Sequence, residues 1–220
     1  MHILLASATT FEIQPTIDYL GEKSTVVPLI TGIGSLATTW SLTAQIRQTR
    51  PDLIIQAGIA GCFTGRRPGE VVAVREEIQG DLGVWEEERF KTTFDLKLAD
   101  PDKAPFSGGK LVNPHGRLLA LTGLDTVTAI TVNEITTDPV RIKWYQQNSR
   151  AVVESMEGAG LHFVGLQEKI PFLQLRSISN DIGVRDKTKW DIRSAIANLN
   201  EQLITLLGKL KKTSLSALEL

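Results

Sequence analysis

Short apolar runs recur along the chain and are separated by stretches with helical periodicity. These runs are rich in Val, Ile and Leu, and several have no polar face, which is typical of strands buried on both sides. The predicted strands are HILLASA (2–8), VVPLITG (26–32), DLIIQAG (52–58), EVVAVREEI (70–78), DTVTAITV (125–132) and PFLQLRSIS (171–179).

Helices are predicted between several of these strands. Ser35 can cap a helix that carries Leu36, Trp40 and Ala44. The pair Asp138–Pro139 is typical of an N-cap followed by proline at the first helical position, so a further helix is expected to begin there.

The last helix has the clearest pattern, because one continuous apolar stripe runs from about Trp190 to Leu210. The tail KKTSLSALEL loses this stripe, so we expect a flexible end at 213–220. The residues of the stripe are Ile192, Ala195, Ile196, Leu199, Leu203, Leu206, Leu207 and Leu210.

The alternation of strands and helices predicts one α/β domain over residues 1–212, with a mostly parallel, twisted central sheet flanked by helices. In such folds, ligands bind at the C-terminal ends of the strands. Residues 79–110 form the least regular stretch, and a loop this long in a compact domain is often a lid or a contact surface.

The composition narrows the possible partners. The formal net charge of −1 gives no electrostatic footprint for nucleic acid or an anionic membrane, so a small molecule is the expected ligand. The first residues, MHILLASATT, have no basic leader, and their apolar run is too short for a signal peptide or a membrane span. We therefore expect a cytoplasmic protein.

Cysteine and histidine usage gives little reason to expect redox or metal chemistry. Cys62 is the only cysteine, which excludes an intrachain disulfide and fits a reducing compartment. A small buried side chain is a simpler role for it than a catalytic thiol. His2, His115 and His162 show no metal-ligand spacing, so we expect neither a metal nor a cofactor.

Four stretches at the ends of predicted strands carry candidate chemistry. The first, Gly32 to Ala37, matches G-x-G-x-x-A, which is a dinucleotide-binding fingerprint when an acidic residue ends the next strand. Asp52 instead begins that strand, and its far end, QAGIAGC, has no carboxylate. A tight turn that lets the backbone approach a small ligand is the better explanation of these glycines.

Glu12 follows the first strand and allows two interpretations. Thr9 and Glu12 have the T-x-x-E spacing of a capping box. A helix capped at Thr9 would contain Pro15, however, and an interior proline costs about 3 kcal/mol. A helix that begins near Gln14 or Pro15 would leave Glu12 free to project into a cleft.

The last two stretches are VVESMEGAGLHF (152–163) and RSISNDIG (176–183). Glu154 and Glu157 flank a predicted strand-to-helix turn. Glu157 can simply be favoured by the helix dipole in a first helical turn, or its carboxylate can accept two hydrogen bonds from a vicinal diol such as a ribose. Asn180 and Asp181 are consecutive, so in an extended chain they cannot both face a ligand; an ordinary polar turn is the alternative.

Taken in order, SATTFEI, GIG, AGIAG, ESMEG and RSISN resemble the nucleoside phosphorylase and nucleosidase superfamily over nearly the whole chain. The combination of ESMEG and RSISN is the most specific part of this resemblance. Within the superfamily, LITGIGSLATTWSLT, GDLGVWEE, AITVNEIT and the late WDI are similar to futalosine hydrolases. That resemblance implies cleavage of futalosine into hypoxanthine and dehypoxanthine futalosine, on a route to menaquinone.

The resemblance also implies roles for individual residues. Glu12 would hold and deprotonate the attacking water, Glu157 would accept the ribose hydroxyls and Met156 would pack against the sugar. Asn180 would contact the purine, and Asp181 is a possible alternative acid. The expected lining of the base site, by side chain or backbone, comprises Ala60, Gly61, Val132, Asn133 and Ser179.

The amide at position 180 suits a 6-oxopurine. In adenine-cleaving relatives an acid at this place can protonate N7 and accept from the 6-amino group. Asn180 can instead donate to O6 and accept from N7–H. A site of this kind is expected to prefer hypoxanthine to adenine, because sites that hydrogen-bond a specific group discriminate strongly.

Other functions remain as alternatives. A methylthioadenosine/adenosylhomocysteine nucleosidase is the second candidate, and a purine nucleoside phosphorylase is the third. Ile59 replaces a hydroxyl residue of some relatives, which favours hydrolysis over phosphorolysis. A non-catalytic nucleoside-binding module would have no need for Glu12. Members of the superfamily commonly form dimers or larger assemblies, so we expect a homo-oligomer.

Overall fold

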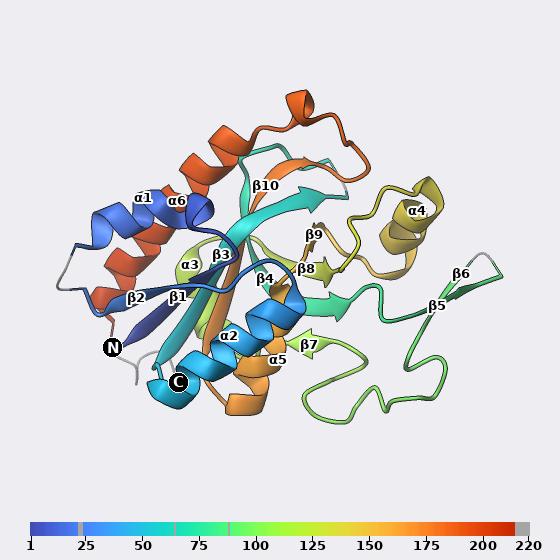
Figure 1. Ribbon diagram of the computed structural model, residues 1–220, viewed down its shortest axis with the longest axis horizontal. Coiled ribbons are helices and arrows are strands. Elements are labelled where there is room, and N and C mark those ends of the chain that lie inside the picture. Colours follow the sequence, from blue (N-terminus) through green and yellow to red (C-terminus); the bar gives the residue numbers. More distant parts are fainter. Residues whose placement is uncertain (22–23, 64, 88, 214–220) are drawn as a thin grey trace.

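A mixed sheet forms the centre of the computed structural model, which describes residues 1–21, 24–63, 65–87 and 89–213 (Figure 1). Five of its eight pairings within these ranges are parallel, so the expected mostly parallel sheet is confirmed. The strands are β1 (Ile3–Ser7), β2 (Val26–Ile30), β3 (Leu53–Cys62), β4 (Val71–Gln79), β7 (Leu111–Val112), β8 (Thr126–Thr131), β9 (Val153–Ser155) and β10 (Phe172–Asp181).

Part of this sheet closes on itself. Strands β10, β4, β8, β9 and β3 pair in that order, and β3 also pairs with β10, so these five strands form a ring. Strands β1 and β2 continue outward from β3. Small and branched side chains fill the ring, as small barrels require; they include Ala60, Cys62, Val72, Val127 and Ile178. The expected burial of Cys62 is therefore confirmed.

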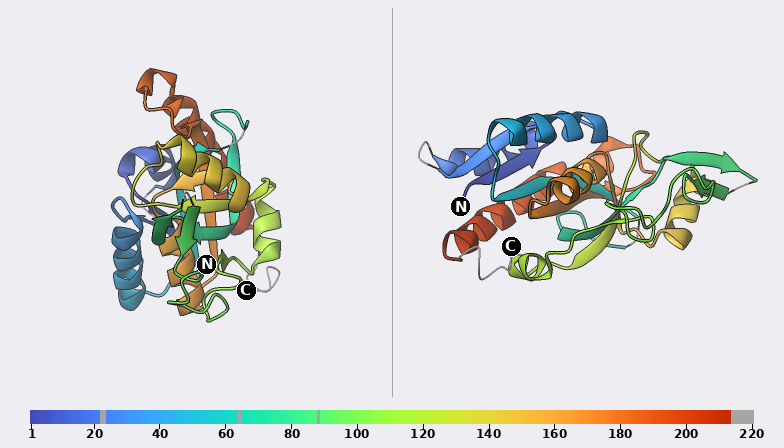
Figure 2. Two further views of the ribbon diagram at one scale, coloured as in Figure 1. Left: turned by 90° about the vertical axis from the view of Figure 1, so that its right-hand side faces the viewer. Right: turned by 90° about the horizontal axis from the view of Figure 1, so that it is seen from below.

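Helices cover both faces of the sheet (Figure 2). Helices α1, α3 and α6 pack on one apolar cluster of the sheet, and α2 and α5 pack on another. The helices are α1 (Thr10–Leu20), α2 (Ser35–Gln48), α3 (Gly116–Thr122), α4 (Pro139–Asn148), α5 (Gly158–Glu168) and α6 (Ile192–Lys211), with one 3-10 turn, η1 (Lys187–Lys189).

The apolar stripe of α6 is buried as predicted. Seven of its eight predicted residues, Ala195 to Leu210, are buried, and only Ile192 is half-exposed at the first position. The pair Asp138–Pro139 also begins α4 as predicted, because the Asp138 carboxylate accepts from two backbone N–H groups of the first turn. Residues 214–220 of the expected flexible tail lie outside the described residues.

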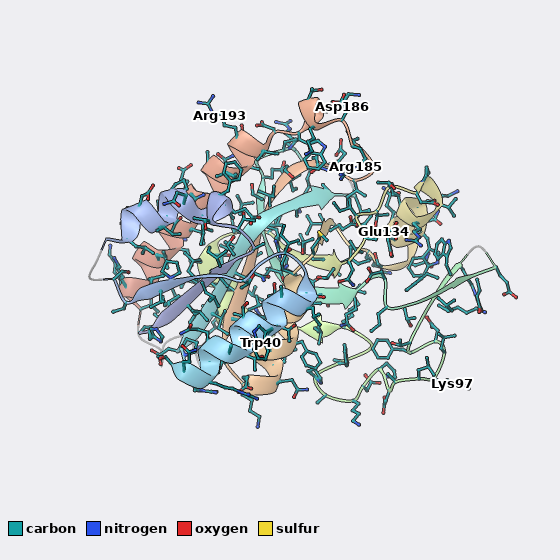
Figure 3. All side chains as sticks on the ribbon, in the orientation of Figure 1. Trp40, Lys97, Glu134, Arg185, Asp186 and Arg193 are labelled. Carbon is teal, nitrogen blue, oxygen red and sulfur yellow. The ribbon has the colours of Figure 1, made fainter. Side chains whose placement is uncertain are left out.

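Helix α2 differs from the sequence prediction in its cap and in its buried face. The N-cap is Gly34, with φ 96°, and Ser35 is the first helical residue. Leu36 and Trp40 are 85% and 72% exposed. Figure 3 shows Trp40 on the outer side of the helix. The helix buries another face, led by Leu42, because that face packs against the sheet and α5.

The irregular stretch 79–110 contains a hairpin that the sequence did not predict. Strands β5 (Gly83–Glu86) and β6 (Arg89–Thr92) form a separate two-stranded sheet that projects from the body of the molecule (Figure 1). Trp85 and Phe90 of the hairpin pack against Trp144 of α4.

No helix within the described residues is long and apolar enough to cross a membrane.

Candidate active site

A cavity of about 300 Å³ opens at the C-terminal ends of β1, β3, β9 and β10. Its position follows from the topology, since β1, β3 and β10 run parallel and end at the same edge of the sheet. The short antiparallel strand β9 pairs with the end of β3 there. It is lined by Ala8, Thr9, Phe11, Glu12, Ile33, Ile59, Ala60, Gly61, Ile135, Glu154, Ser155, Met156, Glu157, Ser179, Asn180, Ile182, Gly183, Val184, Arg185 and Trp190.

Glu12 is held by four hydrogen-bond donors at the start of α1. Its Oε2 accepts from Ser7 Oγ at 3.2 Å, and from the Thr9 backbone N–H and hydroxyl at 3.1 and 2.9 Å. Among the described residues, its Oε1 accepts only from the Ile59 N–H, at 3.0 Å. An ionised carboxylate oxygen has two lone pairs, so Oε1 can accept one more donor from the cavity.

The capping box predicted for Thr9 and Glu12 is confirmed, and Glu12 also reaches the cavity. Helix α1 begins at Thr10, with Thr9 as N-cap and Glu12 as the third helical residue of a capping box. The helix continues through Pro15, so the alternative start near Gln14 is wrong. Glu12 nevertheless lines the cavity. Capping and lining coexist because Oε2 turns back to the N-cap while Oε1 points to β3.

Glu157 is the N-cap residue of α5 and lies beside a buried arginine. Its Oε2 forms an ion pair of 3.2 Å with Arg176 Nη1, and its Oε1 accepts the Gly34 N–H at 3.1 Å. Arg176 is 1% exposed and also donates to Gln56 Oε1 at 3.2 Å. The glycine turn at 32–34 therefore presents its amide to a carboxylate of the protein itself, in place of the phosphate that a dinucleotide fingerprint would bind.

Gly58 makes room for this arrangement. A Cβ atom at Gly58 would lie 2.5 Å from Arg176 Nη1 and 2.9 Å from Glu12 Oε1. Real Cβ atoms essentially never come this close, and both groups are fixed by other contacts. The absence of a side chain at Gly58 thus allows Arg176 and the Glu12 carboxylate to approach the same stretch of β3 backbone.

A β-bulge directs the end of β10 into the cavity. The register with β3 shifts between Ile178 and Asn180, so Ser179 is the extra residue. As a result, Ser179 and Asn180 both line the cavity, whereas the exposed Asp181 is outside its lining. Asn180 Oδ1 accepts from the Ser179 hydroxyl at 2.7 Å, and its Nδ2 donates to the Asp181 backbone oxygen at 2.9 Å.

The structure brings most of the expected site residues together. The cavity is lined by Glu12, Met156, Glu157, Ala60, Gly61, Ser179 and Asn180 among others.

Val132 and Asn133 are placed elsewhere and do not line this cavity. Val132 is buried in an apolar cluster with Tyr145. The Asn133 backbone N–H and side-chain amide both donate to Asp81. Their strand, β8, ends with Thr131, and the chain then turns so that Ile135 is the first residue of this loop to reach the cavity.

Sequence reasoning missed two polar residues at the site. Arg176 stands in an apolar strand run, and a charged residue in such a run was the available signal for a buried ion pair. Glu154, the first acid of ESMEG, was noted only as flanking a turn, but its buried carboxyl lines the cavity. Burial raises the pKa of Glu154, while hydrogen bonds from Thr136 oppose that rise.

A second buried polar cluster supports the N-terminus of α5 from behind. Glu77 Oε1 accepts from the Thr131 hydroxyl at 2.9 Å, and Thr131 Oγ1 in turn accepts the Ala159 N–H at 2.8 Å. Burial raises the pKa of Glu77 to about 7, against the hydrogen bond from Thr131 and the positive charge of Arg176. Glu77 is therefore placed two hydrogen bonds from the helix that Glu157 caps.

The outer wall of the cavity comes from the segment between β10 and α6. Arg185, which is labelled in Figure 3, and Trp190 both lie here. The Arg185 guanidinium is 5.4 Å from the Trp190 ring centre. This stacking is a cation–π contact at the cavity rim.

Among the described residues, no group of three or more His, Cys, Asp or Glu side chains is arranged to hold a metal ion.

Comparison with known proteins identifies the family of this chain and its fold. The profile of the Phosphorylase superfamily matches residues 16–211. The futalosine hydrolase of Thermus thermophilus is 28% identical over 197 residues, covering 83% of this chain and 81% of that protein. The 5'-methylthioadenosine/S-adenosylhomocysteine nucleosidase of Pseudoalteromonas translucida is 27% identical over 209 residues, covering 90% and 86%.

A solved structure agrees in fold. The crystal structure of a 5'-methylthioadenosine/S-adenosylhomocysteine nucleosidase from Colwellia psychrerythraea, in complex with adenine, superimposes with a TM-score of 0.80. The alignment covers 94% of this chain and 95% of that one, at 20% identity. The shared fold confirms the expected nucleoside phosphorylase-like architecture. With a profile match over most of its length, the chain belongs to the phosphorylase superfamily.

Proposed function

We propose that this protein hydrolyses the N-ribosidic bond of futalosine and releases hypoxanthine and dehypoxanthine futalosine. The observation that carries the proposal is the meeting of Glu12, Glu157 and Asn180 in one cavity. The coarser class, an enzyme that hydrolyses N-glycosidic bonds, is common to the named futalosine hydrolase and nucleosidase relatives and holds for this chain.

Glu157 is suited to hold the ribose. Cleavage of an N-ribosidic bond passes through a cation-like transition state, akin to that of glycoside hydrolysis. Among the described residues, Glu157 Oε1 accepts the Gly34 N–H and Oε2 is ion-paired with Arg176, so each oxygen has a lone pair left for a ribose hydroxyl. Arg176 fixes the direction of the carboxylate from behind, while Met156 packs beside it at the cavity wall.

Glu12 is suited to activate the water. Its Oε1 faces β3 with a single protein donor, so a water molecule can donate to the remaining lone pair. The other three donors hold the carboxylate in place, and a positioned base typically accelerates such steps by about 10²–10⁴-fold. Ile59 lies next to it and offers no side-chain donor to a phosphate.

Asn180 supplies the contacts to the departing base. One of its two N–H bonds is used by the Asp181 backbone, and the other can donate to purine O6. Its Oδ1 accepts one bond from Ser179 and can accept a second from N7–H. Charge that develops on the leaving hypoxanthine spreads to O6, where this amide donates.

The second candidate is adenine release from methylthioadenosine or adenosylhomocysteine, the substrates in the names of several relatives. Position 180 discriminates between the two, because an amide cannot deliver a proton to N7 of adenine. Asp181, the possible alternative acid, is outside the cavity lining.

The test is the release of free base, resolved by chromatography, with and without phosphate. The substrates are futalosine, aminofutalosine, methylthioadenosine and inosine. Hypoxanthine from futalosine, independent of phosphate, is the expected result. Adenine from methylthioadenosine or aminofutalosine would establish the second candidate instead, and a strict need for phosphate would identify a phosphorylase.

A further inference from the structure

Three polar side chains meet in the core behind the N-terminus of α5. Glu77 of β4, Gln174 of β10 and His162 of α5 are each fully buried. Glu77 Oε2 and Gln174 Nε2 both lie beneath Gly158, because a Cβ atom at that position would collide with both. Burial raises the pKa of Glu77 and lowers that of His162, and hydrogen bonding with Gln174 opposes both shifts. The amide therefore lies between the acid and the imidazole.

Four atoms of this group have no hydrogen-bond partner among the described residues. They are Glu77 Oε2, His162 Nε2 and both amide atoms of Gln174. Buried polar atoms are nearly always hydrogen-bonded, so the cluster requires an arrangement in which these side chains bond to one another. The Gln174 amide can turn by a half-rotation, which exchanges its donor and its acceptor.

The imidazole fixes the direction of the hydrogen bonds. The Leu111 backbone oxygen can only accept, so His162 Nδ1, which lies 3.0 Å from it, carries a hydrogen. Burial lowers the pKa of His162 to about 4, so the ring is neutral near pH 7 and its Nε2 is an acceptor. That acceptor requires the N–H₂ group of Gln174. The amide oxygen of Gln174 then faces Glu77 Oε2, which must carry a hydrogen of its own.

The other oxygen of Glu77 leads to the active site. Glu77 Oε1 accepts from the Thr131 hydroxyl, whose oxygen accepts the Ala159 N–H. Ala159 is in the first turn of α5, and Glu157 is the N-cap of this helix. The contact from Glu77 thus supports the turn that presents the Glu157 carboxylate to the cavity.

We propose that these three side chains form a hydrogen-bond relay that holds one proton on Glu77 and positions Glu157 for ribose binding. Glu77 donates to Gln174, and Gln174 donates to His162. Glu77 is a positioning residue, because it acts on the substrate only through Glu157. The proposal rests on the proposed function for the ribose at Glu157, and it does not depend on which base is released.

The charges around Glu77 explain why its proton matters. The charged or titratable side chains that face it, among the described residues, are Arg176, Glu157 and His162. The flanking strands β7 and β8 carry no titratable side chain. Burial raises the pKa of Glu77 to about 7, while Arg176 lowers it and Glu157 raises it.

Ionisation of Glu77 would therefore affect the ribose site. One arginine, Arg176, would then face two buried carboxylates, although it already pairs with Glu157 at 3.2 Å. Gln174 would also lose the donor that its oxygen accepts. We expect activity to fall as pH rises through about 7, because the proton is lost over this range.

The experiment measures kcat/KM for base release from about pH 6 to about pH 8.5 in the wild type and in Glu77→Gln. The glutamine can accept from Thr131 with its oxygen and donate to Gln174 with its N–H₂ group, so it copies the protonated acid at every pH. In the wild type, kcat/KM should decline above neutral pH by up to about tenfold per pH unit. Glu77→Gln should stay within a few-fold of the wild type at the acidic end and lose this decline.

Two further variants separate positioning from structural damage. Glu77→Leu has neither donor nor acceptor, so kcat/KM should fall on the order of tenfold or more at every pH, in contrast to Glu77→Gln. If Glu77→Leu does not fold, the pH profile of Glu77→Gln still decides the question. Glu76→Gln is the matched control, because its neighbouring carboxylate on β4 pairs with Lys110 instead, and it should keep the pH profile of the wild type.

Infrared difference spectroscopy detects the proton without turnover. A protonated carboxyl has a carbonyl band that a carboxylate lacks. The wild type minus Glu77→Gln difference should show this band at the acidic end of the range, and the band should disappear at the alkaline end. Subtraction of the variant removes the bands of all other carboxyl groups.

A wild type whose kcat/KM does not decline above neutral pH would overturn the proposal. The same holds for a Glu77→Gln variant that keeps the decline, or for a missing carboxyl band. The substrate assignment fails separately. If base is released from methylthioadenosine and not from futalosine, the profiles are measured with methylthioadenosine; loss of the decline in Glu77→Gln would then keep the relay and overturn only the substrate.

Discussion

Glu157 and Arg176 form an ion pair of 3.2 Å in which the two side chains are only 7% and 2% exposed. Neither charge is solvated well enough to exist there alone, so each depends on the other. Because the same Glu157 carboxylate faces the cavity, the ion pair links the stability of the sheet to the geometry of the proposed ribose site.

Arg176→Met should therefore destabilise the fold. Removing one partner of a buried pair leaves an uncompensated charge, which typically costs 3–5 kcal/mol, so we expect a loss of about this size in the free energy of unfolding. Urea denaturation followed by circular dichroism measures it. The double variant Arg176→Met/Glu157→Gln should recover part of the loss, because no unpaired charge remains; a double variant that is no more stable than the single one would contradict the pairing.

Glu12→Gln should remove turnover and leave the fold intact. The amide cannot take a proton from water, so we expect kcat for base release to fall by about 10²–10⁴-fold. Glutamine at this position keeps the length of the side chain, although its N–H₂ group loses some of the four present hydrogen bonds. Binding of free hypoxanthine should be little changed. Turnover within a few-fold of the wild type would exclude the role of Glu12 as base.

Asn180→Asp should change base preference. An acid at this position can protonate N7 and accept from a 6-amino group, so the ratio of kcat/KM for aminofutalosine to that for futalosine should rise. Asp181→Asn is the matched control, because its side chain lies outside the cavity lining and should leave the ratio unchanged.

Much of the fold could be predicted because its elements carry local signals. Asp138 and Pro139 encode the start of α4 in two residues, and the stripe of α6 repeats over five turns. Strand β9, with three residues, is too short to show alternation, and the closure of β3 on β10 is a non-local pairing that no local pattern reports.

The candidate site was predictable only in part, for similar reasons. Glu12, Glu157 and Asn180 stand at strand ends, where chemistry is expected from topology. Val132 and Asn133 also follow a strand, but Val132 packs in an apolar cluster and the Asn133 N–H donates to Asp81. The presence of Glu154 in the cavity wall depends on the pairing of β9 with β3, which only the sheet register reveals.

The buried side chains of Glu77 and His162 should give opposing pH dependences of stability. Burial raises the pKa of Glu77 from 4.5 to about 7, so folding retains a proton and stability falls as pH rises through this window. Burial lowers the pKa of His162 from 6.5 to about 4, so the unfolded chain binds more protons and stability rises with pH between these values. Each effect is on the order of 3 kcal/mol, and the two largely cancel between pH 4.5 and 6.5.

Single variants should separate the contribution of Glu77 to the pH dependence of stability from that of His162. Glu77→Gln removes the contribution that falls as pH rises. Relative to the wild type, the free energy of unfolding of this variant should therefore rise by about 3 kcal/mol between pH 4.5 and 6.5. For His162→Gln, the free energy of unfolding relative to the wild type should fall over the same pH range by a similar amount. Subtracting the wild-type curve removes the titration of all other groups, Glu154 included. Parallel curves for the wild type and both variants would show that neither buried group changes its protonation on unfolding. Opposite slopes would establish that the Glu77 carboxyl beneath Gly158 is protonated below neutral pH.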